Sequence, residues 1–369
     1  MPSILIALAL WLGSDIAIDA TARARIDQLA EAALRDGPVA GLSIAVGRGS
    51  ETIFASGYGY ADVENGVPAT PETVYRIGSI TKQFTAAAIL SLRAEGKLAL
   101  DDPLTRHLPE FPTRGHQVTI HHLLTHSSGI KSYTELGPRW TRTVPLDMTH
   151  AEIVDLFKDE PYDFAPGHGF HYSNSGYFLL GMIIEKASGQ TYADYLRDHV
   201  FAPAGLTATC YGDERSLIKH RAQGYDVDRH TLVNDRPISM TQPYAAGALC
   251  STVLDLLRWQ RALVDYRLLD DEAFALMTTA HVATQSTEAR SRSYGYGVFL
   301  GELERHPSIQ HGGGINGFVT QLAFYPDDDL TIAVLANTDP ASPGRIEEQI
   351  ARLLLKLPPL PEPVRIGSR

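Results

Sequence analysis

Cysteine and long apolar runs are scarce in this 369-residue sequence. Cys210 and Cys250 lack the spacing of metal ligands, so they indicate either one disulfide in an oxidising compartment or two small buried side chains. The apolar run at residues 4–12 is too short to span a bilayer but has the length of a secretory signal's core. We therefore expect residues 1–20 to be a signal peptide and the protein to be periplasmic or secreted. The alternative is an N-terminal helix packed on the body, because residues 1–3 carry no Lys or Arg.

Positive charge is also low, with 32 Lys and Arg against 43 Asp and Glu and a net charge of −11. No run of Lys or Arg occurs, so nucleic acid and anionic membrane surfaces are not expected partners, and the mature chain is not expected to insert in a membrane. The chain lacks the Gly-x-Ser-x-Gly elbow of α/β-hydrolases and the Walker A sequence of nucleotide-binding proteins. These absences argue against an α/β-hydrolase and against a nucleotide-binding protein of the Walker A type.

Metal and dinucleotide sites are not indicated either. His122 and His126 stand four residues apart without the intervening acid of a zinc protease, so we expect a buried loop anchor. Residues 312–317 match Gly-x-Gly-x-x-Gly but lead into a strand pattern, whereas a dinucleotide fingerprint opens a helix. We expect no metal and no cofactor.

Strand patterns lie at both ends of the chain and helical patterns lie in its middle. Strands are predicted at residues 41–49, 51–62, 294–303, 318–326 and 330–338, and terminal helices at 21–36 and 344–356. The simplest packing is an α/β fold, in which the terminal helices flank one antiparallel sheet and an all-helical lobe packs against it. The predicted boundaries are 21–78 with 285–357 for the sheet lobe, 79–284 for the helical lobe, and 358–369 for a tail. A ligand site is expected in the cleft between the lobes.

The pattern Ser-x-x-Lys occurs three times, and only one copy opens a long helical pattern. Ser128 with Lys131 lies in a turn, and Ser216 with Lys219 lies in a charged segment. Ser79 and Lys82 instead begin "SITKQFTAAAILSLRAEG", so their side chains share one helix face. A desolvated lysine can accept a proton from a serine, and a helix N-terminus favours negative charge. The alternative is a serine cap beside a solvated lysine.

Two further motifs supply polar groups suited to hydrolysis. Tyr172-x-Asn174 precedes the helical pattern at 176–189, and a tyrosine near cations can shed or share its proton, while an asparagine can hold a lysine and a substrate carbonyl. The alternative is a simple helix entry. His311-x-Gly313 lies in "HGGGINGF", where glycines let a substrate approach and a main-chain N–H face an oxyanion.

Taken in order, Ser79-x-x-Lys82, Tyr172-x-Asn174 and His311-x-Gly313 resemble the three motifs of the serine β-lactamase and penicillin-binding-protein superfamily. The tyrosine form of the second motif is similar to the branch of class C β-lactamases, D-alanyl-D-alanine carboxypeptidases, D-aminopeptidases and carboxylesterases. The resemblance covers about residues 25–355. It implies a β-lactamase-like fold and a cofactor-free serine hydrolase.

By position, the resemblance implies that Ser79 is the acyl-enzyme nucleophile, Lys82 and Tyr172 share acid and base work, and Asn174 orients Lys82 and the substrate. The backbone N–H groups of Ser79 and Gly314 would form the oxyanion hole, and His311 and Gly313 would help to bind the substrate. One departure is His311-Gly312-Gly313, which stands where β-lactamases and carboxypeptidases carry Lys-Thr-Gly, and a mostly neutral histidine weakens carboxylate recognition.

We therefore expect action on an ester, an amide or a peptide, and substrates with D-residues fall within this expectation. The alternatives are a β-lactamase or D-Ala-D-Ala carboxypeptidase, an acyltransferase, and a non-catalytic sensor, and the oligomeric state stays open.

Overall fold

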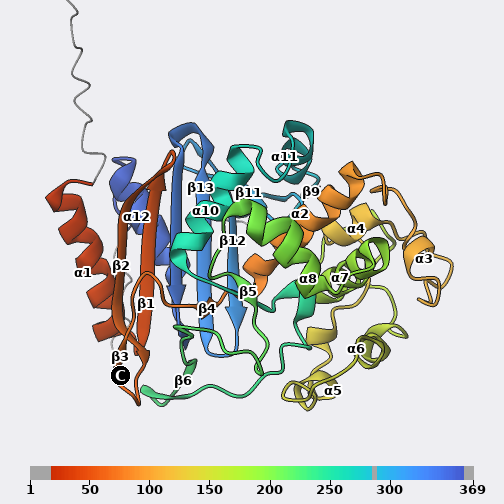
Figure 1. Ribbon diagram of the computed structural model, residues 1–369, viewed down its shortest axis with the longest axis horizontal. Coiled ribbons are helices and arrows are strands. Elements are labelled where there is room, and N and C mark those ends of the chain that lie inside the picture. Colours follow the sequence, from red (N-terminus) through yellow and green to blue (C-terminus); the bar gives the residue numbers. More distant parts are fainter. Residues whose placement is uncertain (1–17, 285–288, 361–369) are drawn as a thin grey trace, which may run out of the picture.

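The computed structural model describes residues 18–284 and 289–360, in which nine strands form one antiparallel sheet (Figure 1). The strands cross the sheet in the order β3-β2-β1-β14-β13-β12-β11-β10-β9. Their bounds are β1 (Gly41–Arg48), β2 (Glu51–Asp62), β3 (Val67–Pro68), β9 (Val282–Ala283), β10 (Ser293–Tyr294), β11 (Phe299–Leu303), β12 (His306–Ile315), β13 (Phe318–Tyr325) and β14 (Leu330–Ala336). Strands from the two ends of the chain meet at its centre, where Ile44 lies opposite Val334. The expected antiparallel sheet is confirmed.

Helices cover both faces of this sheet. Their bounds are α1 (Ala20–Asp36), α2 (Thr81–Ala94), α3 (Leu104–His107), α4 (Ile120–Leu124), α5 (Pro138–Thr141), α6 (His150–Phe157), α7 (Asn174–Ser188), α8 (Tyr192–Leu196), α9 (Ala202–Ala204), α10 (Val253–Val264), α11 (Asp271–Met277) and α12 (Pro343–Leu354). As expected, the terminal helices α1 and α12 lie together on one side, while α10 and the helical body lie on the other (Figure 1).

Successive residues of the central strands enter different cores, because side chains alternate across a sheet. Ile44 and Val334 pack in one apolar cluster with Ile26 of α1 and Ile350 of α12. The neighbouring residues, including Leu335, belong to a second cluster shared with the helical body. Burial on both faces explains why these strands read as nearly continuous apolar runs.

The expectation of an all-helical middle segment needs a correction, because two small sheets lie within or beside it. One has the order β4 (Tyr75–Arg76), β8 (Leu249–Ser251) and β5 (Cys210–Tyr211), and the other has β15 (Thr338–Asp339), β6 (Tyr225–Asp228) and β7 (Thr231–Asn234). Strands of two to four residues are too short to show a period, and most of their partners are distant in sequence. Cys210 and Cys250 lie opposite one another on β5 and β8 as free thiols.

The strand predicted at residues 294–303 is interrupted. Between β10 and β11 the chain turns back on itself, with Gly295 N donating to Val298 O at 2.9 Å, and Tyr296 N donating to Met277 O at 2.9 Å. No helix among the described residues is long and apolar enough to cross a membrane. The predicted signal peptide falls mainly on residues 1–17, which lie outside the described residues.

Candidate active site

Ser79 lies in a tight turn between strand β4 and helix α2. The 3-10 turn Gly78–Ile80 runs directly into α2, so Ser79 precedes the helix and is not its cap, which is Ile80. Gly78 has φ 51°, and a Cβ on it would lie 2.9 Å from the Gly314 backbone nitrogen. A residue without a side chain therefore lets the serine turn touch strand β12.

Lys82 is fully buried one turn after Ser79. Its Nζ lies 3.1 Å from Ser79 Oγ, 2.8 Å from Asn174 Oδ1 and 2.8 Å from the Ala246 carbonyl oxygen. Burial lowers the pKa of Lys82 well below its ordinary value of 10.5. A neutral amine has two N–H bonds, which the two carbonyl-type oxygens can accept, and one lone pair, which is left for the Ser79 hydroxyl. This arrangement suits a base that takes the proton of Ser79.

Asn174 opens helix α7 and holds Lys82 from the opposite side. Ser173 caps this helix, with its hydroxyl accepting from Gly176 N, so the cap and the functional amide are different residues. The Asn174 Nδ2 donates to Thr134 Oγ1 at 3.1 Å, which fixes the amide so that Oδ1 faces Lys82. The predicted contact between Asn174 and Lys82 is present.

Tyr172 places its ring against Lys82, with Nζ 4.7 Å from the ring centroid. Its hydroxyl is buried and makes no well-formed hydrogen bond to a described residue. The Ser79 hydroxyl is nevertheless close enough to influence the pKa of Tyr172. Burial raises the pKa of Tyr172 above its ordinary value of 10, and Ser79 opposes this shift. Of the two roles expected for Tyr172, shedding or sharing its proton, burial favours sharing. The phenol is the stable form, and it can donate a hydrogen bond but not accept a proton readily.

His126 fixes the position of the Tyr172 ring. The centroids of the two rings lie 4.2 Å apart, and His126 Nδ1 accepts a hydrogen bond from the Ser173 backbone N–H at 3.0 Å. His126 is 1% exposed and has φ 57°, a conformation that costs energy unless surrounding contacts hold it. The buried loop anchor expected for this histidine thus supports the tyrosine motif itself.

Replacing His126 with alanine is expected to lower kcat about 10- to 100-fold with a smaller change in KM, because a displaced Tyr172 ring weakens reacting geometry more than binding. Steady-state kinetics on an activated ester would measure both constants. His126→Asn is the matched control, since asparagine tolerates positive φ and its oxygen can accept from Ser173 N. Recovery of kcat in this variant is expected, and equal loss in both would contradict a role through the backbone bond.

Glycines of strand β12 bring its main chain to the serine turn. A Cβ on Gly313 would lie 2.0 Å from the Ile77 carbonyl oxygen, whereas a Cβ on Gly314 would meet nothing within 4 Å. Gly314 is exposed, and its nitrogen lies beside Gly78. After Gln310, strand β12 pairs with β13 but no longer with β11, so residues 311–315 have one open edge. The Gly314 nitrogen therefore lies beside the serine turn, where the predicted oxyanion hole would need it.

Gly313→Ala is expected to destabilise the protein by about 3 kcal/mol, because the added methyl overlaps a backbone oxygen that cannot move away. Gly314→Ala is the matched control and should leave the melting temperature nearly unchanged. Thermal unfolding followed by circular dichroism would measure both. Similar melting temperatures for the two variants would contradict the close contact at Gly313.

His311 is turned away from the open site. It is 2% exposed, its Nδ1–H donates to the Gly312 carbonyl at 2.6 Å, and its Nε2 accepts from the Tyr294 hydroxyl at 3.1 Å. Burial, together with Lys82, lowers the pKa of His311 to about 3, so the ring is neutral at pH 7. The expectation that His311 contacts substrate is corrected, because both ring nitrogens already have partners inside the protein.

The other two Ser-x-x-Lys pairs do not form a site. Lys131 pairs with Glu135 at 3.2 Å and with Asp163 at 3.1 Å, and the neighbouring Ser128 is buried. The exposed Ser216 donates its hydroxyl to Asp213 at 3.0 Å. The helix context used to select Ser79 therefore agrees with the side-chain geometry.

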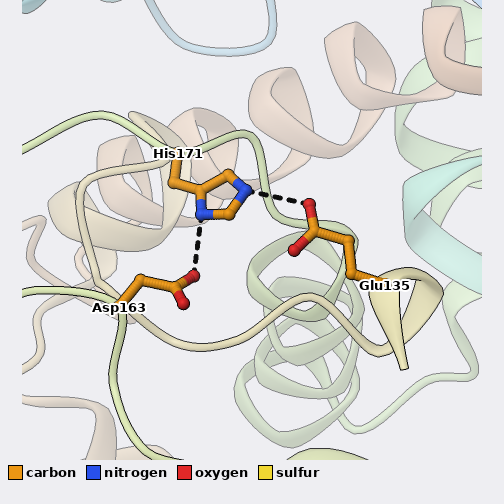
Figure 2. Close-up of side chains that lie close together, drawn as sticks. All are labelled: Glu135, Asp163 and His171. Atoms are coloured by element: carbon orange, nitrogen blue, oxygen red, sulfur yellow. Dashed lines mark hydrogen bonds and ion pairs between the residues drawn. The ribbon is translucent and has the colours of Figure 1, made fainter. Parts of the chain in front are cut away.

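His171, the residue before Tyr172 in the sequence, lies in an ion network with Glu135 and Asp163 (Figure 2). His171 Nε2 lies 2.8 Å from Glu135 Oε1, and Nδ1 lies 2.7 Å from Asp163 Oδ2. Two carboxylates and an imidazole are a plausible ligand set, but opposite ring nitrogens face different carboxylates, so one ion could not use both contacts. Lys131 already supplies a cation to the same carboxylates. The geometry is that of a hydrogen-bonded clamp beside Tyr172.

A cavity of about 300 Å³ lies at the predicted active site. Ser79, Asn174 and Gly314 line it, and Tyr133 and Trp140 are among the apolar groups of its wall. The residues come from the serine turn, the helical body and strand β12, so the cavity lies where sheet and helices meet. The predicted site residues Ser79, Lys82, Tyr172, Asn174, Gly313 and Gly314 are thus brought together, and His311 stands behind them.

Several groups at the site were not predicted. The Ala246 carbonyl and Thr134 hydroxyl hold Lys82 and Asn174, yet neither residue belongs to a motif. A main-chain oxygen leaves no signal in residue type. Thr134 could have been suspected from its place after the "HSSGIKSY" turn, but only the fold brings it to Asn174.

The fold and the paired serine and lysine define a serine hydrolase. Residues 26–356, which are most of the chain, match the model of the Beta-lactamase family. The chain is 30% identical to penicillin-binding protein 4* of Bacillus subtilis over 314 residues, which are 80% of this chain and 68% of that protein. The chain belongs to the beta-lactamase family, as its three motifs indicated.

Solved structures of relatives share this fold. The octameric penicillin-binding protein homologue from Pyrococcus abyssi has a TM-score of 0.81 and 31% identity, with 91% of this chain and 78% of that chain covered. A D-amino acid amidase from Ochrobactrum anthropi SV3, crystallised with L-phenylalanine amide, has a TM-score of 0.80 and 28% identity, with 91% and 98% covered. Relatives thus include penicillin-binding and amidase proteins.

Proposed function

We propose that this protein hydrolyses an ester, amide or peptide bond, in substrates that include D-amino-acid derivatives, through an acyl-enzyme on Ser79. The contact between Ser79 Oγ and the buried Lys82 Nζ supports this proposal most directly. Lys82 takes the Ser79 proton as the hydroxyl oxygen attacks the substrate carbonyl carbon. The backbone N–H groups of Ser79 and Gly314 stabilise the resulting oxyanion.

Release of the leaving group then needs a proton donor. The proton held by Lys82 can pass to the leaving oxygen or nitrogen, and the Tyr172 phenol lies beside Lys82 to donate a hydrogen bond. Water attacks the acyl-enzyme in the second half, with Lys82 again acting as base. An amide substrate is supported by the similarity of this chain to a D-amino acid amidase.

The direct test is covalent labelling. A fluorophosphonate probe should add its mass to Ser79 in intact-protein and peptide mass spectra, and the Ser216 peptide should stay unlabelled. A panel of short p-nitrophenyl esters, D-alanine amide and nitrocefin then compares the substrate classes. Absence of the adduct, together with absence of turnover across the panel, would refute the proposal.

A further inference from the structure

We propose that Asp339 forms a subsite for a substrate ammonium group, which names the substrate class of the hydrolase proposed above and rests on that function. Asp339 lines the same cavity as Ser79. Among the described residues that line this cavity, it is the one carboxylate, and no Lys, Arg or His is among them. A cationic group entering the cavity therefore meets one anion and no repelling cation.

Asp339 is held at the rim by the small sheet that β15 forms with β6 and β7. It ends β15, and its register partner in the parallel strand β6 is Asp226. Asp339 is exposed and makes no ion pair within the described part of the chain. Partial burial and the nearby negative charge of Asp226 raise the pKa of Asp339, and no cationic partner among the described residues opposes this shift. An ammonium group would supply that partner.

Neighbouring cations are occupied elsewhere. Arg76, which precedes the serine turn, pairs with Glu214 at 2.6 Å and with Asp235 at 3.4 Å. Lys82 is buried behind Ser79 with three oxygen partners. A substrate carboxylate that entered the cavity would therefore meet no free cation among the described residues, and Asp339 would repel it.

The cavity walls define the rest of the substrate. Tyr133, Trp140, Ile238 and Ile315 line the cavity together with Asp339. These side chains favour an uncharged apolar group, so charge recognition is left to the rim. The substrate class that fits is an ester, amide or short peptide with a free amine and an apolar side chain, and without a nearby carboxylate.

The test compares two substrates that differ only in the ammonium group: alanine p-nitroanilide, measured as both enantiomers, and propionyl p-nitroanilide. Asp339→Asn should lower kcat/KM for the faster alanine enantiomer about tenfold and change the propionyl value less than about twofold. Asp228→Asn is the matched control, because Asp228 is exposed on the same small sheet, does not line the cavity, and gives the same change in net charge. It should leave both values unchanged.

Charge reversal gives a second measurement. Asp339→Lys should raise the relative rate on succinyl p-nitroanilide, which presents a carboxylate in place of the ammonium group. An equal effect of Asp339→Asn on both substrates, or a wild-type preference for propionyl over alanine, would overturn the subsite. Turnover of p-nitrophenyl propionate reports the serine chemistry separately. If that ester is also left intact, the proposed hydrolase itself has failed.

Discussion

Ser79→Ala is expected to lower kcat/KM by at least about 10⁴-fold on any substrate that the wild type hydrolyses, because removing the nucleophile abolishes the covalent route. The melting temperature should change little, since Ser79 is only partly buried and its hydroxyl contacts the Lys82 amine at 3.1 Å without filling a closed core. The oxyanion N–H groups remain in this variant, so a small residual rate above that of water is expected. Enzyme kinetics with thermal unfolding on the same preparation would measure both effects.

The matched control is Ser216→Ala. Ser216 also stands three residues before a lysine but is exposed and bonded to Asp213. It should retain wild-type kinetics and wild-type labelling by the fluorophosphonate probe. Activity that survives in Ser79→Ala to within tenfold of the wild type would contradict a nucleophilic role for Ser79.

Lys82→Met is expected to lower kcat/KM about 10³-fold, within the range found for a positioned base. Methionine has similar length and fits a buried site, but it cannot accept the Ser79 proton. Lys82→Arg should be almost as slow, because arginine keeps a cation but is not deprotonated in proteins. Lys219→Met is the control at an exposed Ser-x-x-Lys lysine and should be silent.

The pH profile separates a base from a simple cation. Burial lowers the pKa of Lys82, so the amine is protonated and inactive at low pH, and kcat/KM rises as the pH rises through that pKa. Burial raises the pKa of Tyr172, so its loss of a proton should not limit activity below pH 10. If activity instead fell as Lys82 lost its proton, or if Lys82→Arg kept full activity, the role as base would be contradicted.

Local patterns predicted the fold class and the nucleophile because their physics is local. The sheet strands carry apolar residues on both faces, and the terminal helices carry apolar stripes, so both were visible as periods. Ser79 and Lys82 lie three residues apart at a helix start, and this spacing alone brings their side chains onto one face. The short strands β5 and β8 were missed because two or three residues show no period.

The position of the His311 side chain could not be predicted from its residue type alone. Comparison with Lys-Thr-Gly placed it at the substrate, whereas Tyr294 and the Gly312 carbonyl occupy both of its nitrogens. Tyr172 was expected to shed or share its proton, and the burial of its hydroxyl favours the neutral phenol, which shares it. Both results come from burial, which depends on packing from several distant segments.

By itself, the sequence determined the family and the antiparallel sheet, and it predicted Ser79 as the nucleophile. Only the tertiary structure decided that Lys82 is buried and that its pKa is lowered, because its partners Asn174 and Ala246 are 92 and 164 residues away in the chain. It also decided that Asp339 meets the cavity of Ser79, through a strand pairing with β6. The pKa of Lys82 and the effect of the Asp339 charge on the cavity both depend on the groups around them. Those groups come from distant parts of the sequence, and folding brings them together.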